Sequence, residues 1–289
     1  MMIAGLISAI IILLFIRIYI SGYTRIAKVL SLNFWDIEHE NLPSVSEENK
    51  ALVLHKAKEC LIVVTDPVGQ KRTGEIACAM AKNTLQEAFK HYNGESSPKD
   101  FLKQACFRAH RRISEQMNFA GGGCSIAILY IKGKKLYWAS SGNIGIYLLG
   151  KELEQLNQMD LYKHKLSEVV LQGKINKGEV LRNHLKNELT SYLGYENFRK
   201  IELNEEDLKL KSSHQLFIAT RKVYETLYIL EIEKLLRGAG RPSRKIKKIK
   251  KAFFAQVKDE TKEKKTSASQ PVIALAFRFH KHKVYKKEQ

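Results

Sequence analysis

The chain has 289 residues, of which 44% are hydrophobic, and a formal net charge of +19. Its length is sufficient for one large domain or two small ones, and its hydrophobic fraction is typical of a globular protein. The four cysteines include no CxxC pair and no metal-ligand spacing, which excludes the common cysteine-based zinc motifs and favours a reducing compartment. The positive charge indicates an anionic partner: a membrane surface, a nucleic acid, a phosphoprotein or an acidic protein.

An apolar run occupies the N-terminus. Residues 1–16 carry no charge, and after Arg17 the run continues to Ile20. Twenty helical residues rise about 30 Å, the thickness of a bilayer's hydrocarbon core, so residues 1–22 are predicted to form one transmembrane helix. Lys and Arg follow the run rather than precede it, which predicts the N-terminus outside and the rest in the cytoplasm. A cleavable signal peptide would begin with positive residues; a buried core helix is the third alternative.

The remaining elements follow from hydrophobic period and turn signals. Residues 23–50 read as a polar, irregular juxtamembrane segment. The sequence then predicts a strand at 61–64, two amphipathic helices at 74–92 and 101–117, and a three-strand meander at 121–150. After these it predicts a buried strand at 216–219, a helix at 231–254 that is broken at "GAGRP", a charge-dense connection at 258–265 and a last strand at 271–279. This order indicates one α+β domain.

Several motifs in this frame resemble those of the metal-dependent (PPM, or type 2C) protein serine/threonine phosphatases. The family's D-G-x-G-G-H-x-x-G-E-x-A is matched at five positions: Asp66, Gly69, Gly74, Glu75 and Ala77. "GGCS" at 122–125 stands where the family has its small-residue step, and "NELTSYLG" at 187–194 matches N-x-L-T-x-x-L-G. The resemblance extends from about Cys60 to Phe279.

The resemblance implies a four-layer sandwich of two antiparallel sheets flanked by helix pairs, at residues 51–280, followed by a basic tail at 281–289. In the family, two divalent ions share an aspartate and activate a bridging water for attack on phosphate. Such a centre needs several carboxylates, because hard dications require oxygen ligands and neutralising charge.

Most of these ligands are missing at the matching positions. Asp66 stands in the place of the bridging aspartate, but the glycine after it is Pro67. Arg221 stands where the family has the aspartate of S-D-G, and Gln270 stands where it has that of D-N-x-T. A guanidinium repels a dication, so neither Mn²⁺ nor Mg²⁺ is expected as a cofactor.

We interpret Asp66 as a remnant of the lost site. Arg221 would replace the positive charge of the metal and pair with Asp66; a simple turn-capping role for Asp66 is the alternative. The chain is therefore expected to be a membrane-tethered pseudophosphatase that binds a protein, with a kinase, a phosphoprotein or a membrane-complex subunit as candidates. An active, divergent metal-dependent phosphatase is the alternative.

A basic amphipathic helix precedes the last strand. Its cationic residues, expected to contact an anionic surface, are Arg244, Lys245, Lys247, Lys248, Lys250 and Lys251. Ile246, Ile249 and Phe253 recur at helical spacing and are expected to pack on a sheet. The charges would then be a solvated face, a contact with anionic lipid, or a nucleic-acid site, which ranks last because no aromatic platform accompanies them.

Overall fold

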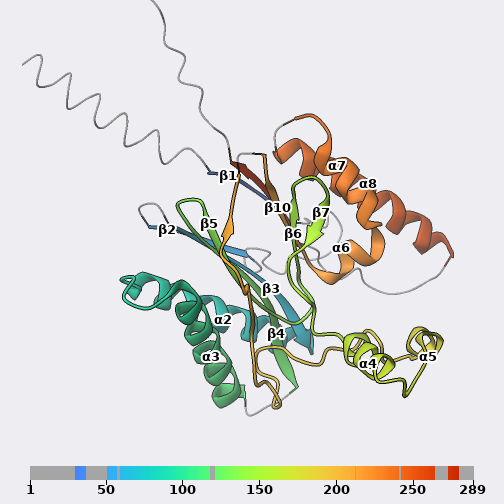
Figure 1. Ribbon diagram of the computed structural model, residues 1–289, viewed down its shortest axis with the longest axis horizontal. Helices are drawn as coiled ribbons and strands as arrows, with labels where there is room; N and C mark the ends of the chain where they lie inside the picture. Colours follow the sequence, from blue (N-terminus) through green and yellow to red (C-terminus); the bar gives the residue numbers. More distant parts are fainter. Residues whose placement is uncertain are drawn as a thin grey trace, which may run out of the picture.

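The computed structural model of the chain describes residues 30–36, 51–56, 59–117, 121–211, 213–240, 242–263 and 273–279. Two antiparallel sheets lie face to face, with helices on both outer faces (Figure 1). Helices α2 (Lys71–His91) and α3 (Pro98–Met117) cover one sheet, and α6 (Arg221–Thr226), α7 (Ile229–Arg237) and α8 (Pro242–Glu263) lie on the other side. The predicted α+β sandwich is confirmed.

The first sheet carries the site and has the order β2-β3-β4-β5-β8, with β9 also paired to β5. Its strands are β2 (Ala51–Lys56), β3 (Glu59–Gly69), β4 (Gly122–Lys132), β5 (Lys135–Ser141), β8 (Glu202–Leu203) and β9 (Leu208–Lys209). A hairpin turn at Gly133 joins β4 to β5, as the predicted meander at 121–150 requires, and this glycine has a positive φ of 62°.

The second sheet has the order β1-β11-β10-β6-β7. Its strands are β1 (Leu30–Asp36), β11 (Ile273–Phe279), β10 (Gln215–Ala219), β6 (Gly145–Leu149) and β7 (Leu153–Gln155). The strands predicted at 216–219 and at 271–279 are both present. Strand β1 corrects the sequence analysis, because it lies inside the segment that was expected to be irregular, and it pairs with β11 along its length.

Strand β3 is longer than predicted, because it extends past Val64 to Gly69. Its pairing with β2 ends at Val64, whereas its pairing with β4 continues to the pair Gly69–Gly122. Pro67 lies in this last part and has no N–H to donate, which suits a stretch that is paired on one side only. The longer strand carries Asp66 within regular pairing rather than in a loop.

Alternation along the strands divides the core into three layers. In β3, Leu61 and Val63 face α2 and α3, whereas Ile62 and Val64 face the other sheet. The layer under α6, α7 and α8 contains residues of β6 and β10 together with Ile232, Leu236, Ile246, Ile249 and Phe253. The apolar face predicted for the basic helix is therefore buried. Helix α8 also continues to Glu263, so most of the connection expected at 258–265 is helical.

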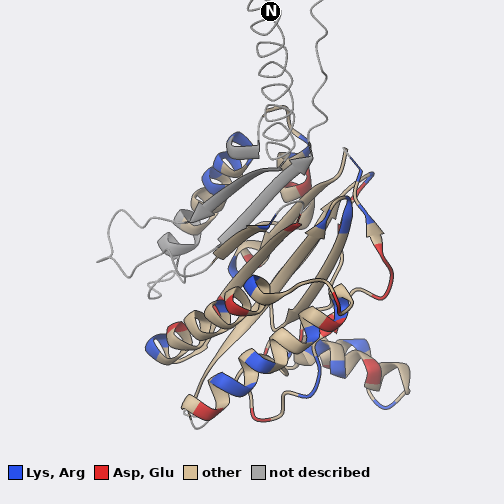
Figure 2. Ribbon diagram, turned by 90° about the vertical axis from the view of Figure 1, so that its left-hand side faces the viewer, with Lys and Arg blue, Asp and Glu red and all other residues tan. Residues whose placement is uncertain are grey.

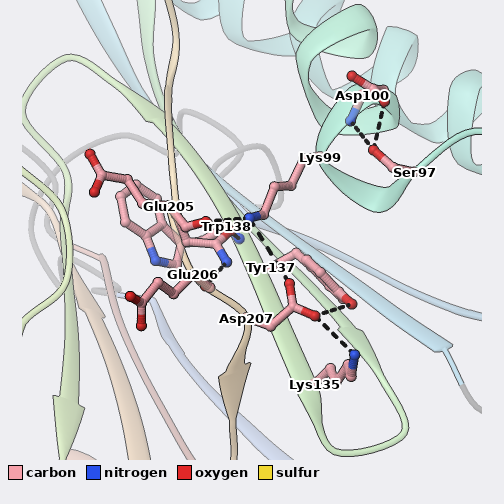
Figure 3. Close-up of polar contacts among 10 residues, drawn as sticks. Ser97, Lys99, Asp100, Lys135, Tyr137, Trp138, Glu205, Glu206 and Asp207 are labelled. Atoms are coloured by element: carbon pink, nitrogen blue, oxygen red, sulfur yellow. Dashed lines mark hydrogen bonds and ion pairs between the residues drawn. The ribbon is translucent and has the colours of Figure 1, made fainter.

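A polar cluster ties the edge of the first sheet to α3 (Figure 3). Asp207 accepts a hydrogen bond from Lys135 at 2.9 Å and lies 4.0 Å from Lys99. The side chain of Asn204 accepts from the backbone N–H of Trp138 at 2.9 Å. Exposed ion pairs stabilise a fold only slightly, so this cluster mainly fixes the turn before β9.

None of the helices in the described ranges is long and apolar enough to cross a membrane. The span predicted at 1–22 and the basic tail at 281–289 lie outside those ranges.

The packing of α8 yields a stability prediction. Ile249→Ala should lower the free energy of unfolding by about 2–4 kcal/mol, because Ile249 is fully buried and its loss leaves a cavity. Lys248→Ala on the exposed face of the same helix should change it by less than about 0.5 kcal/mol. Urea denaturation followed by tryptophan fluorescence measures both, and equal effects would contradict the assigned packing.

Candidate functional site

Asp66 lies near the end of β3, opposite Ser125 of β4. It is two residues beyond Val64 in a regularly paired strand, so it points to the same side, toward the layer between the sheets. Ser125 is fully buried and Asp66 is half-buried. The strand geometry therefore places this carboxylate at one end of the sandwich interior, where the remnant aspartate was expected.

Tyr224 connects helix α6 and the turn between β5 and β6 at this end of the sandwich. Its hydroxyl donates a hydrogen bond to the backbone carbonyl of Asn143 at 2.7 Å, which links α6 to the turn between β5 and β6. Burial raises the pKa of Tyr224, and so do nearby Tyr147 and Glu225; Arg221 lowers it and Asp66 raises it. Asp66 and Arg221 are thus both close enough to act on one phenol, with opposite signs.

Arg221 is the first residue of α6, directly after Thr220 at the end of β10. Its Nε forms an ion pair with Glu225 at 2.6 Å, and its Nη1 donates to the carbonyl of Asn187 at 3.0 Å. Asn187 opens the "NELTSYLG" segment, so Arg221 fastens that segment to α6. A guanidinium has five donors, which leaves capacity for a further partner. The pair with Asp66 stays a prediction.

Asp160 is a site residue that the sequence analysis missed. Its carboxylate accepts hydrogen bonds from the backbone N–H of Gly142 at 2.9 Å and from the hydroxyl of Ser141 at 3.1 Å. Gly142 has a φ of +102°, and a Cβ there would lie 2.2 Å from the hydroxyl oxygen of Ser125. Asp160 therefore holds a tight turn directly against the strand pair that carries Asp66. No local motif marks it, because its partners lie 18 or 19 residues away.

Two buried thiols lie beneath the site. The Sγ atoms of Cys78 and Cys124 are 3.2 Å apart, and both side chains are in the core. Burial raises the pKa of Cys124, and so do Cys78 and Asp66, whereas the nearby Lys82, which is itself buried, lowers it. A thiol held protonated is a poor nucleophile. All four cysteines of the chain are buried.

The described oxygens at this end of the sandwich do not fit a pair of divalent cations. Near Asp66, the hydroxyl of Ser125 and the side-chain oxygen of Asn143 are buried without a hydrogen-bond partner, but both are neutral. Within the described residues, no group of three or more His, Cys, Asp or Glu could hold a metal. Gln270, the other substituted position, lies outside them. Asp66 with these neutral oxygens is a poor ligand set for two dications, and the carboxylate of Asp160 already accepts hydrogen bonds from Gly142 and Ser141.

The second candidate site is the cationic face of α8, where Figure 2 shows Lys and Arg in blue. One of the six residues predicted for this face was wrong. Arg244, Lys247, Lys248 and Lys251 are exposed, and Lys250 is partly so. Lys245 is buried instead, and its ammonium group donates to the side-chain oxygen of Gln215 at 2.8 Å and to the carbonyl of Leu236. Helical spacing alone could not show this, because the neighbouring layer supplies the acceptors.

Comparisons with known proteins agree with the predicted resemblance, although no family model matches. The chain is 23% identical to the serine/threonine phosphatase stp of Listeria innocua over 210 residues, 70% of this chain and 79% of the relative. The solved serine/threonine phosphatase of S. agalactiae is similar over 87% of this chain and 99% of its own, with a TM-score of 0.68 and 18% identity.

A third likeness is to the catalytic domain of serine threonine protein phosphatase PstP, solved in complex with two manganese ions. It covers 87% of this chain and 100% of that one, with a TM-score of 0.62 and 16% identity. The chain has the fold of the PPM-type serine/threonine phosphatases and is distantly similar in sequence to the phosphatase stp.

The environment of Asp160 predicts a pH dependence. Burial raises the pKa of this carboxyl, against the hydrogen bonds from Gly142 and Ser141. A carboxyl whose pKa is higher in the folded state contributes stability that is full below its ordinary pKa and is lost as the pH rises. Asp160→Asn removes this loss, so the variant should gain stability relative to the parent between about pH 4 and pH 7.

Asp207→Asn is the matched control of opposite sign. The hydrogen bond from Lys135 lowers the pKa of Asp207, so its small contribution is present at neutral pH and is lost as the pH falls. Urea denaturation at a series of pH values measures both variants. A parallel pH dependence of Asp160→Asn and the parent would contradict the assigned burial.

Proposed function

We propose that the chain is a membrane-tethered, catalytically inactive phosphatase-like domain whose function is to bind a protein. The observation that carries this proposal is the charge at the end of the sandwich: Asp66 is accompanied by Arg221 where phosphatases of this fold need further carboxylates. The fold itself is shared with phosphatases, so the fold alone does not decide activity.

Electrostatics supports inactivity. Two dications bring four positive charges, and each carboxylate replaced by a neutral group leaves one of them uncompensated. A guanidinium in place of a carboxylate changes the local charge by two units and repels the metals at short range, where solvent screens weakly. Without the metals, no water is activated for attack on phosphate.

The same charges suggest how the fold persists without metal. Arg221, which already forms an ion pair with Glu225, supplies a covalently attached cation, and Asp66 would be its second anionic partner. Both act on Tyr224, which places each within electrostatic reach of that phenol. In this proposal the Asp66–Arg221 pair substitutes for the metal centre and keeps the end of the sandwich close to neutral.

Exposed apolar side chains support a role in protein binding. Leu171, at the end of α4 (Tyr162–Leu171), is 88% exposed, and Leu181 of α5 (Lys177–Arg182) is 69% exposed. Tyr228 and Leu230, at the start of α7, are 80% and 75% exposed. Exposed large apolar side chains of this kind are candidates for a surface that contacts another protein. A kinase, a phosphoprotein or a membrane-complex subunit remains the proposed class of partner.

The tether is part of the same proposal. Residues 1–20 form an apolar run of bilayer length, and Arg17, Arg25 and Lys28 lie at its end or after it. The positive-inside rule then assigns the domain to the cytoplasm.

A metal titration tests inactivity. Manganese should neither raise the melting temperature saturably nor support hydrolysis of a phosphate ester, because ligand binding stabilises only a protein that has the site. In metal-free buffer, Asp66→Asn should lower the free energy of unfolding by about 1 kcal/mol, since it removes one of the two carboxylates proposed to pair with the half-buried Arg221, which keeps its ion pair with Glu225. Asp207→Asn, an exposed carboxylate of the sheet edge, should have little effect.

The PstP catalytic domain assayed alongside provides the positive control for metal and substrate. A saturable rise in melting temperature with manganese that Asp66→Asn abolishes would restore Asp66 as a ligand and overturn the proposal.

Cysteine labelling in intact cells tests the topology. All four native cysteines are buried, so a cysteine introduced at Gln172, an exposed position after α4, would be the reactive one. An impermeant maleimide should label it only after the cells are permeabilised. Labelling of intact cells would contradict the assigned orientation.

A further inference from the structure

We propose that the exposed cationic face of α8 lies against anionic membrane lipid and orients the domain so that its phosphatase-like end points away from the bilayer. This inference rests on the tether proposed above. It adds an orientation, which follows from strand register and from the exposure of individual side chains.

The cationic face consists of Arg244, Lys247, Lys248 and Lys251, which are all exposed. Their spacing of three, four and seven residues places them on one side of a helix, opposite the buried Ile249. Among the described residues, none of these four forms an ion pair. The face therefore presents uncompensated positive charge to whatever it meets.

The strand register fixes where this face lies. Lys245 donates to Gln215, the first residue of β10. Gln215 is paired with Arg278 of β11, and Arg278 is paired with Ser31 of β1. The first turns of α8 therefore lie at the end of the sheet where β1 begins. That end of β1 is also where the chain arrives from the apolar N-terminal run.

The connecting length is short. Seven residues, 23–29, separate the predicted span 1–22 from the start of β1 at Leu30, and they extend over at most about 25 Å. A tether of this length holds the near end of the sheet close to the lipid headgroups. The cationic face starts at that same end, within reach of a negatively charged surface.

The phosphatase-like site lies at the opposite end. Strand β10 ends at Ala219, which is paired with Ala274 beside the far end of β1 at Asp36. Arg221 and Tyr224 follow directly, and Tyr224 contacts Asn143. Helices α4 and α5 also lie far from the start of β1 (Figure 1). One β1 length, about 20 Å, separates the two ends of the sheet, so lipid at one leaves the other free.

Anionic lipid is a better match than nucleic acid for this face. Juxtamembrane Lys and Arg are attracted by acidic headgroups with no need for specific geometry. Single-stranded nucleic acid would require aromatic side chains on which bases stack. The exposed positions of α8 between Arg244 and Lys251 are all cationic, with no aromatic among them.

The experiment measures energy transfer in lipid nanodiscs that hold the full chain. One donor dye is attached through Ala255→Cys, an exposed position on the face of α8, and in a second preparation through Gln172→Cys at the distal end. The native cysteines are buried and do not compete. The acceptor is a labelled headgroup in discs of phosphatidylcholine alone or with phosphatidylserine.

Transfer from position 255 should be higher in discs with phosphatidylserine, should fall as salt is added, and should exceed transfer from position 172. Replacing Arg244, Lys247 and Lys251 together by Gln should abolish the dependence on phosphatidylserine. The matched control replaces three exposed lysines of the distal end, Lys165, Lys174 and Lys177, and should leave it unchanged.

Equal transfer in both lipids, or higher transfer from position 172, would overturn the orientation. Carbonate extraction of the same discs tests the tether separately, because an integral chain stays with the lipid. Extraction of the chain would contradict the proposed tether. In that case the role of the cationic face is tested by flotation with phosphatidylserine vesicles, and the bound fraction should fall more than tenfold in the triple α8 variant. Binding to heparin that is lost in this variant without any transfer to headgroups would assign the face to a soluble polyanion.

Discussion

The pairing of β3 with β4 is the constraint on which the rest of the structure depends. Its register runs without a break from Glu59–Lys132 to Gly69–Gly122. Because side chains alternate along such a pair, one register fixes both the layer under α2 and α3 and the layer between the sheets. It also decides where Asp66 points. A slip of one residue would turn Asp66 toward the helices and bury a charge in an apolar layer, at high cost.

If the proposed inactivity holds, the site at the end of this pair illustrates how a fold persists without the chemistry that it supports in other proteins. Core alternation, the Gly142 turn and the contact between Tyr224 and Asn143 need no metal, since they depend on packing and on neutral hydrogen bonds. A metal centre depends on charge instead. Under the proposal, substituting carboxylates removes the ligand set while it leaves the layers intact, and Arg221 would limit the electrostatic cost to the remaining Asp66.

Much of the fold was predictable because it depends on residues that are close together in the sequence. Apolar period and turn residues located β4, β5, β10, α7 and α8, and the order of motifs gave the architecture. What depends on partners distant in sequence was not predictable. Lys245 is buried because Gln215 accepts from its ammonium group, and Asp160 is a site residue because the Gly142 turn folds back onto it. Strand β1 could have been found from the sequence, because Leu30, Leu32 and Phe34 alternate with Ser31 and Asn33 as in a strand with one apolar face.

The effect of the net charge of +19 on binding to an anionic surface depends on where the charged residues lie. At physiological ionic strength an exposed charge acts over about 8 Å, so only residues that lie next to a surface contribute to its attraction. Exposed lysines of α4 and α5 add to the total but lie far from the start of β1. Those of α8 lie at that end, because Lys245 fastens the helix to β10 there. The buried, hydrogen-bonded Lys245 thus positions the exposed cationic residues next to it. Under the proposed tether, the position of these charges, more than their number, would determine which end of the domain faces the lipid.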